Sequence, residues 1–126
     1  MNVAIRLALF ALLASLVCAS ARASDYEVGP SLACDTQAQV ERFVALFTGD
    51  AQSALRVVNA EEQNPNACVI RKVAYMRGMK VGIVRHNNSA FEIVRILVVG
   101  VETSGGIVPV HPSIHFSLFG VKEYVV

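Results

Sequence analysis

Apolar positions after residue 36 recur with the period of a helix. Four apolar side chains fall at i, i+3, i+4 and i+7, namely Val40, Phe43, Val44 and Phe47. This spacing places them on one face of an α-helix. The segment from Thr36 to Gln39 has the form of a capping box. Gly49 can adopt the left-handed backbone conformation that ends many helices. The pattern therefore predicts a first helix from Thr36 to about Thr48.

A second, shorter helix is predicted directly after the first one. Asp50 is a favourable N-cap residue, and Ala51, Leu55 and Val58 share one helical face. The turn-forming sequence Asn64-Pro65-Asn66 ends this helical region before Cys68. The two helices are therefore expected to form a helical hairpin.

From Cys68 onward the pattern changes to that of β-strands. Stretches rich in Val, Ile, Phe and Tyr cover residues 69–75, 80–85, 90–103 and 107–124. Hairpin turns are expected where they are separated, at Arg77-Gly78, Asn87-Asn88 and Ser104-Gly105-Gly106. His111-Pro112 is expected to break or bulge the last stretch, because proline has no amide hydrogen for a ladder. Five strands are therefore favoured over four.

These elements together predict an α+β fold. An N-terminal helical hairpin would pack on a bent antiparallel sheet of four to five strands, which could close as a small barrel. The region after residue 23 is long enough for one hydrophobic core and too short for two. We therefore expect a single globular domain over residues 24–126.

The first 23 residues have the features of a cleavable signal peptide. Arg6 is followed by an apolar stretch from Leu7 to Val17, which is interrupted only by Ser15. This stretch is shorter than the roughly 20 apolar residues of a membrane-spanning helix, and Ala21-Arg22-Ala23 offers small residues for cleavage. We expect cleavage after Ala23, a periplasmic or secreted product and no stable membrane insertion afterwards.

Cysteine usage agrees with export. Cys18 would leave with the signal peptide, so the mature domain would retain Cys34 and Cys68 in an oxidising compartment. A structural disulfide between them is expected. The alternative, a redox-active or metal-binding pair, lacks the C-x-x-C spacing that lowers a thiol pKa.

Charge is nearly balanced overall but unevenly distributed. After residue 23 there are nine basic and ten acidic residues, which gives no general attraction to nucleic acid. Segment 25–62 contains seven acidic and two basic residues, whereas segment 69–95 contains six basic residues and one acidic residue. One interpretation is that acidic helices and basic strands neutralise each other where they meet. The other is a basic face for an anionic partner, formed by Arg71, Arg77, Arg85 and Arg95.

The last stretch contains a row of polar residues. His111, Ser113, His115 and Ser117 alternate with apolar residues, so on a strand they share one side. The opposite row of Ile114, Phe116 and Leu118 is expected to face the core, which leaves the polar row toward solvent or a groove. Metal binding by His86, His111 and His115 is the alternative function. Two imidazoles four strand residues apart lie about 13 Å from each other, too far to share a metal unless the chain bends at Pro112.

Motifs for catalysis or cofactor binding are absent from the sequence. It contains no G-x-S-x-G, P-loop or H-E-x-x-H pattern. The adjacent carboxylates of Glu61 and Glu62 would point about 100° apart on a helix, which does not suit paired acid–base chemistry. We therefore expect a protein that is not an enzyme and needs no cofactor.

Three segments carry a resemblance to a group of proteins, namely residues 33–46, Asn59-Ala60-Glu61-Glu62 and Phe91-Glu92-Ile93-Val94-Arg95. They resemble small exported alphaproteobacterial proteins of unknown function. The resemblance implies a Gram-negative periplasmic setting and no particular chemistry. The leading hypothesis is a non-enzymatic domain that binds another macromolecule or a small anionic ligand.

Overall fold

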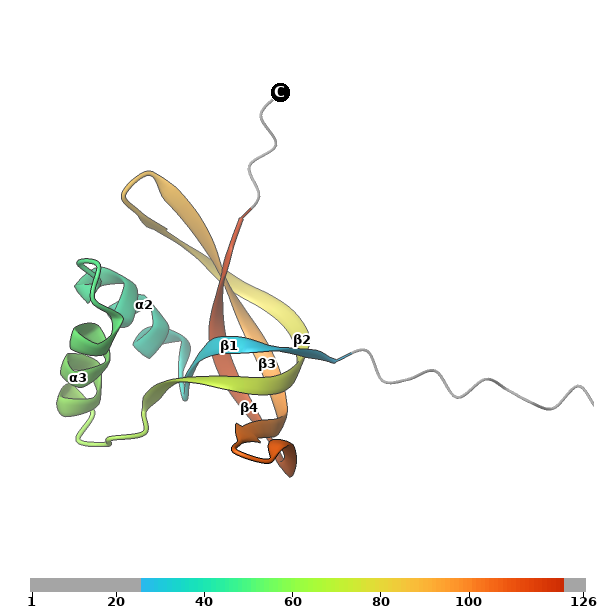
Figure 1. Ribbon diagram of the computed structural model, residues 1–126. Helices are drawn as coiled ribbons and strands as arrows, with labels where there is room; N and C mark the ends of the chain where they lie inside the picture. The colour runs from blue at the N-terminus through green and yellow to red at the C-terminus, as the bar shows by residue number, and fades with distance from the viewer. Residues whose placement is uncertain (1–25, 122–126) are drawn as a thin grey trace, which may run out of the picture.

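The computed structural model describes residues 26–121, which form two helices and four strands (Figure 1). In chain order these are β1 (Glu27–Cys34), α2 (Gln37–Leu46), α3 (Ala51–Glu61), β2 (Cys68–His86), β3 (Ser89–Thr103) and β4 (Gly106–Gly120). This arrangement confirms the α+β class. The predicted signal peptide and its cleavage site lie outside the described residues.

The element order differs from the prediction because a strand precedes the helices. β1 pairs antiparallel with β2 from Glu27 opposite Tyr75 to Cys34 opposite Cys68. The strand was not predicted, since its Gly29 and Pro30 disfavour strands in sequence-based reasoning. The helical hairpin is therefore an insertion between two paired strands rather than an N-terminal unit.

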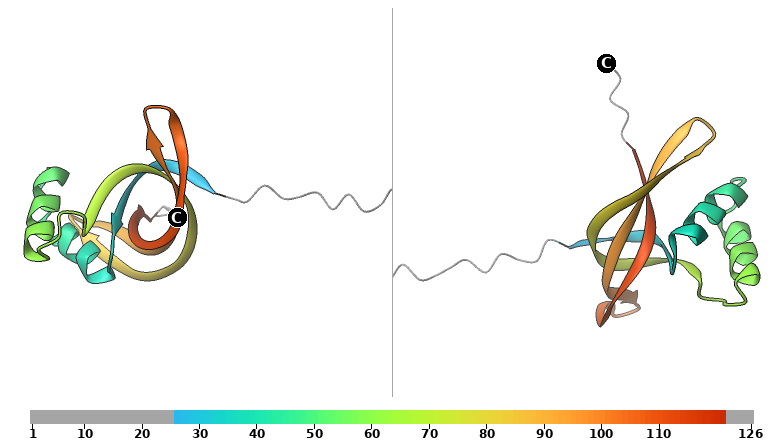
Figure 2. Two further views of the ribbon diagram at one scale, coloured as in Figure 1. Left: turned by 90° about the horizontal axis from the view of Figure 1, so that it is seen from below. Right: turned by 180° about the vertical axis from the view of Figure 1, so that it is seen from behind.

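The four strands form one antiparallel sheet in the order β1-β2-β3-β4. The sheet is strongly bent, and Figure 2 shows the strands curling around a common centre. Its outer strands β1 and β4 meet at a single residue pair, Cys34 and Phe116. The predicted bend is thus present, and β1 and β4 are paired at one position, without the continuous ladder of a fully hydrogen-bonded barrel.

The structure has four strands among the described residues, not the five that were favoured. The predicted turn at Arg77-Gly78 is wrong: β2 continues through it, and the register with β3 shifts between Arg77 and Lys80. Pro112 also lies within a continuous strand, because β4 bulges there, between the partners of Val98 and Gly100. Bulges absorb the local disruption that glycine and proline cause without ending a strand.

The other two predicted turns are confirmed. Asn87 and Asn88 have φ angles of 48° and 67° and connect β2 to β3. Gly106, with a φ of 106°, follows the turn between β3 and β4. Asparagine and glycine tolerate this left-handed region, which β-branched residues avoid.

The helix starts were predicted correctly because capping is a local property. The Thr36 hydroxyl accepts a hydrogen bond from the Gln39 amide at 3.2 Å, and the Gln39 side chain accepts one from the Thr36 amide at 3.1 Å. Asp50 accepts hydrogen bonds from the amides of the next helix, at 3.1 and 3.3 Å. The first helix ends at Leu46, two residues before the predicted end.

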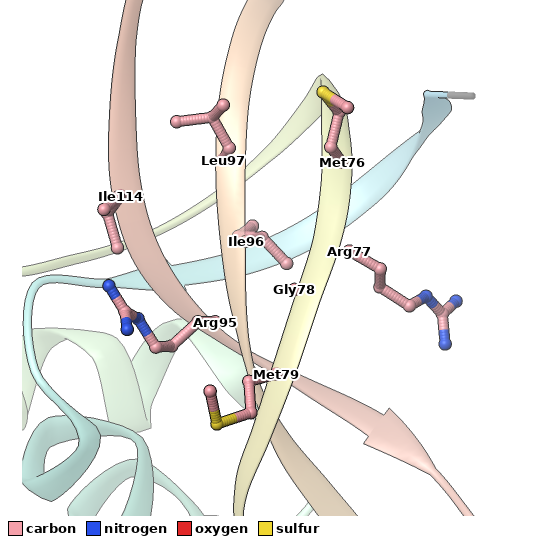
Figure 3. Close-up of a pocket in the computed structure, with 8 residues that line it drawn as sticks. All are labelled: Met76, Arg77, Gly78, Met79, Arg95, Ile96, Leu97 and Ile114. Atoms are coloured by element: carbon pink, nitrogen blue, oxygen red, sulfur yellow. The ribbon is translucent and has the colours of Figure 1, made fainter. Parts of the chain in front are cut away.

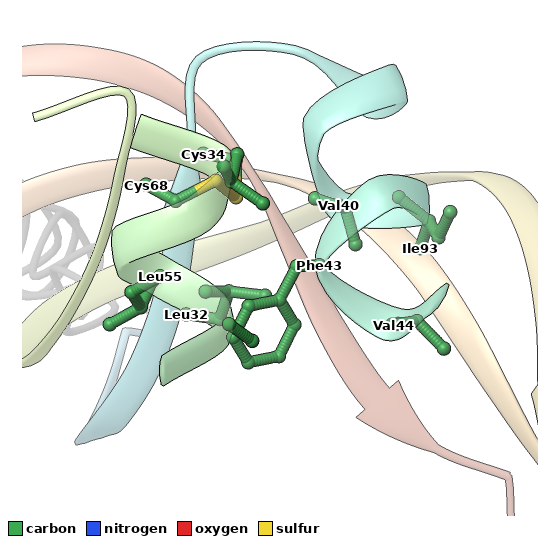
Figure 4. Packing of buried hydrophobic residues seen from close by; sticks show 10 residues of the cluster. Leu32, Cys34, Val40, Phe43, Val44, Leu55, Cys68 and Ile93 are labelled. Carbon is green, nitrogen blue, oxygen red and sulfur yellow. A yellow bond between two sulfur atoms is a disulfide. The ribbon is translucent and has the colours of Figure 1, made fainter. Parts of the chain in front are cut away.

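Buried side chains form two clusters. The larger one joins both helices to the sheet around the Cys34–Cys68 disulfide, whose S–S bond is 2.05 Å (Figure 4). The smaller one lies within the strands and consists of Val73, Tyr75, Val94, Ile96 and Val98. In the part of the chain that the structure describes, no helix is long and apolar enough to cross a membrane.

Candidate functional site

A row of aliphatic side chains crosses three strands on a solvent-facing part of the sheet. Met76 of β2 pairs with Leu97 of β3, which pairs in turn with Ile114 of β4. Ile114 is 54% exposed, which corrects the expectation that it faces the core. Neither helix is packed over this row, because both lie to one side of the strands (Figure 1).

The bulge in β2 shapes the surface beside this row. Arg77 pairs with Ile96 and Lys80 with Val94, so Gly78 and Met79 together face a single residue, Arg95. A Cβ atom on Gly78 would lie 2.9 Å from the Arg95 carbonyl oxygen, so the close approach of the two backbones requires glycine here.

The result is a hollow of about 330 Å³, which we call the arginine hollow. Its lining comprises Met76, Arg77, Gly78, Met79, Arg95, Ile96, Leu97 and Ile114 (Figure 3). Most of these side chains are apolar, and Met79 is 69% exposed. Exposed apolar groups gathered in a concave place are typical of binding sites.

The two arginines of the hollow differ in their availability. Figure 3 shows the Arg95 side chain extending toward Ile114, whereas the Arg77 side chain points away from the hollow. Arg77 donates hydrogen bonds of 2.8 and 2.9 Å to the Glu27 carboxylate, and these bonds raise the pKa of Arg77. Within residues 26–121, no carboxylate lies within 4.0 Å of Arg95. Arg95 is therefore the cation that the hollow offers to an external anion.

The four arginines proposed from the sequence do not gather on one surface. Arg71 lies early in β2 opposite Ser31, and Arg85 lies near the far end of the same strand opposite Ala90. Arg95 lies in the middle of β3, next to the bulge. Of the predicted set, Arg77 and Arg95 line the arginine hollow, and of these two Arg77 is paired with Glu27.

Ion pairs give limited support to the predicted neutralisation of the two charged segments. Arg42 pairs with Glu61 inside the helical hairpin at 2.8 Å. Two further pairs lie inside the sheet, Lys72 with Glu102 and Lys80 with Glu92. Among the described residues, the ion pair between Glu27 and Arg77 joins the acidic segment to the basic segment. Glu27 belongs to β1 and not to a helix.

The three histidines are not brought together. His86 ends β2, and its ring lies 5.8 Å from the Phe47 ring, whereas His115 is paired with Ile96 near the middle of the sheet. The portion from residue 26 to residue 121 holds no group of three His, Cys, Asp or Glu side chains able to bind a metal ion. The alternative metal site receives no geometric support.

The polar row of β4 forms a small cluster where the outer strands meet. Ser113 Oγ lies 2.9 Å from His115 Nε2, and His115 Nδ1 lies 3.7 Å from a carboxylate oxygen of Asp35. The second distance exceeds hydrogen-bond range, so Asp35 does not fix the ring as an orienting carboxylate in a hydrolase would. Ser117 is only 1% exposed, so the expectation that this whole row faces solvent or a groove is wrong at its end.

The arginine hollow was missed by sequence reasoning for two reasons. Gly78 was interpreted as part of a turn, and Ile114 was assigned to the core. The available signal was the sequence Met76-Arg77-Gly78-Met79, in which two flexible apolar side chains flank a glycine. This sequence indicates a bulge beside Arg95 only when the register between β2 and β3 is known.

The chain matches no protein-family model, no curated protein and no solved structure in the comparisons made. The functional interpretation therefore rests on the chain's own residues.

Proposed function

We propose that this chain is a non-enzymatic, exported binding domain whose ligand combines one anionic group with an apolar part. The observation that carries this proposal is the position of Arg95, which has no carboxylate partner among the described residues and borders an apolar hollow of about 330 Å³. The sequence hypothesis of an anionic partner is thereby narrowed to one cation and one surface.

The chemistry of the lining supports such a ligand. A guanidinium presents several donors in a planar fork, which suits a carboxylate or a phosphate. Methionine side chains are flexible and polarisable, so Met76 and Met79 can adapt to an apolar chain. Burying exposed methionine side chains under a ligand removes apolar surface from water, which is the main favourable contribution to binding.

Export is supported by two features of the chain. The first is the leader-like segment at residues 1–23, and the second is the Cys34–Cys68 disulfide, which is compatible with an oxidising compartment. A periplasmic or secreted location remains part of the proposal.

Calorimetric titration with octanoate provides the test. Octanoate has the required carboxylate and apolar chain, octanol lacks the charge, and octylammonium reverses it. We expect binding of octanoate, weaker binding of octanol and no binding of octylammonium. Arg95→Gln should weaken octanoate binding about tenfold or more, which corresponds to roughly 1.5–3 kcal/mol for a hydrogen bond to a charged group.

Arg85→Gln is the matched control. Arg85 lies on the same sheet, has no carboxylate within 4.0 Å among the described residues and does not line the arginine hollow. Equal loss of octanoate affinity in both variants would indicate attraction by overall charge. That result, or no octanoate binding to the unmodified protein, would contradict the proposed function.

A further inference from the structure

A second hollow adjoins the arginine hollow on the same sheet. It has a volume of about 410 Å³, and its apolar lining includes Tyr26, Val99 and Ile107. Tyr26 is 54% exposed and Ile107 is 40% exposed. We call it the tyrosine hollow.

Met76 lines both hollows. The register explains why they are neighbours: Ala74 pairs with Gly100, which pairs with Pro109, and this row lies next to the row that contains Met76. Residues two apart on a strand share a face, so Ala74 and Met76 point to the same side. The hollows therefore follow each other along the strand direction, with the Met76 side chain between them.

Charged side chains lie at one end of this surface among the described residues. Arg95 borders the arginine hollow only, and within residues 26–121 the lining of the tyrosine hollow contains no charged side chain. A ligand that satisfies both ends needs an anionic head at Arg95 and an apolar tail beyond Met76.

We propose that the two hollows form one continuous track for a single-chain amphiphile, with its carboxylate or phosphate at Arg95 and its chain extending across Met76 into the tyrosine hollow. This inference rests on the proposed function and adds the class of ligand to it. One cation and two apolar hollows in series fit one head and one extended chain. Each hollow, at about 330 and 410 Å³, lies within the size range of ordinary small-molecule sites.

The length of the ligand's alkyl chain is the variable that tests the proposed track. Affinity should rise by about two- to fourfold for each added methylene that leaves water. We propose calorimetric titrations with hexanoate, octanoate, decanoate and dodecanoate, each below its micelle concentration. The expected result is a steady rise in affinity that continues beyond octanoate, because the longer chains enter the tyrosine hollow.

Ile107→Glu places a charge in the tyrosine hollow without touching the arginine hollow. It should leave octanoate affinity within about twofold of the unmodified protein and abolish the extra affinity of decanoate and dodecanoate. Ile83→Glu is the control, because Ile83 is 59% exposed on the same sheet and lines neither hollow. Thermal unfolding of both variants before titration shows whether they are folded.

The outcomes separate the track from the proposed function. If octanoate binds through Arg95 but affinity does not rise for longer chains, or rises equally in Ile107→Glu, the track is wrong and the proposed function stands. If no carboxylate binds, both fail. Co-sedimentation with phosphatidylglycerol vesicles, in the absence of binding to monomeric carboxylates, would indicate a membrane-surface protein and overturn the single-chain ligand.

Ligands with a phosphate head group form the second part of the titration experiment. Dodecyl phosphate and dodecanoate share the chain and differ in the head, so their comparison identifies which anion Arg95 prefers. Dependence of either ligand on Arg95 supports an anion site at that residue, and the track requires in addition that Ile107→Glu weakens binding of the same ligand. Binding of both ligands with undiminished affinity to Arg95→Gln overturns the track together with the proposed function.

Discussion

The guanidinium carbon of Arg77 lies 3.8 Å from the centre of the Phe119 ring. The same guanidinium donates two hydrogen bonds to Glu27. Arg77 thus connects β1, β2 and β4 through contacts that all lie within the domain. Among the four arginines of the predicted binding set, Arg77 therefore contributes to the fold through these contacts.

Arg77→Gln should lower the free energy of unfolding and should weaken octanoate binding less than Arg95→Gln does, because the Arg77 guanidinium is bonded to Glu27 and points away from the hollow. The exposed ion pair contributes about 0.2–1 kcal/mol and the cation–π contact about 0.5–1 kcal/mol, so a loss of about 1–2 kcal/mol is expected. Urea unfolding of Arg77→Gln and of Arg85→Gln measures the difference. Weakened octanoate binding by Arg77→Gln at unchanged stability would place Arg77 in the binding site instead.

Acid sensitivity should include a contribution from Glu61. Its pKa is lowered by hydrogen bonds from the Arg42 guanidinium. A carboxylate with a lowered pKa in the folded state stabilises the fold above the ordinary glutamate pKa of about 4.3, and this contribution is lost as the pH falls below that value. Glu61→Gln should therefore lose less stability than the unmodified protein between pH 5 and pH 3. Urea midpoints at both pH values test this, and parallel losses would contradict it.

Local signals account for the parts of the fold that were predicted correctly. Thr36 and Asp50 cap helices through hydrogen bonds to amides two or three residues away, so their effect can be recognised in sequence. The positive φ angles of Asn87 and Asn88 are likewise a property of a short turn. Each of these features is decided within a few residues.

Nonlocal pairing accounts for the parts that were missed. The segment Glu27–Cys34 is a strand because it pairs with β2 along its whole length. Its local sequence does not predict a strand, since Gly29 and Pro30 disfavour one. Gly78 has the same sequence signature in a hairpin turn and in a bulge, and only the register with Arg95 distinguishes them.

The candidate site illustrates the same limit. Arg95 was named from the charge pattern, but its apolar surroundings depend on residues from three strands, Met76, Leu97 and Ile114. The exposed position of Ile114 also opposes the usual expectation for an aliphatic strand residue. Sequence patterns thus identified a component of the hollow without its geometry.

Thiol counting tests the disulfide and the predicted leader together. Cys34 and Cys68 are directly paired across β1 and β2 and are disulfide-bonded. Denatured, unreduced protein from the extracytoplasmic fraction should have no free thiol and should begin at or near Ser24. One free thiol would indicate that Cys18 is retained, and two or more would contradict the disulfide.

Reduction of the disulfide should destabilise the domain strongly. The two cysteines are separated by 34 positions in the sequence. In the chain-entropy model, closing a loop of this size corresponds to about 3–4 kcal/mol. Urea unfolding of Cys34→Ala/Cys68→Ala should show a loss of this order, and a loss below about 1 kcal/mol would contradict a structural role.

Asn59 is expected to be the most sensitive polar residue of the helical hairpin. Its side-chain amide donates hydrogen bonds of 3.0 Å to the carbonyl oxygens of Pro65 and Cys68, and its Oδ1 accepts one of 2.8 Å from the Cys68 amide. Because Cys68 is only 1% exposed, its backbone groups would lose their partner in Asn59→Ala without easy access to water. A buried group left unsatisfied costs about 1–3 kcal/mol, so we expect a loss of about 2–3 kcal/mol.

Asn64→Ala is the control for this prediction. The Asn64 side chain accepts a hydrogen bond of 2.9 Å from the Asn66 amide in the exposed turn, where water can replace it. This variant should lose no more than about 1 kcal/mol, because an exposed hydrogen bond has a small net contribution. Guanidinium unfolding at pH 7 without reductant compares the two variants. Similar losses would show that Asn59 contributes only as an ordinary turn residue, and that the start of β2 is held by the disulfide and the β1 ladder alone.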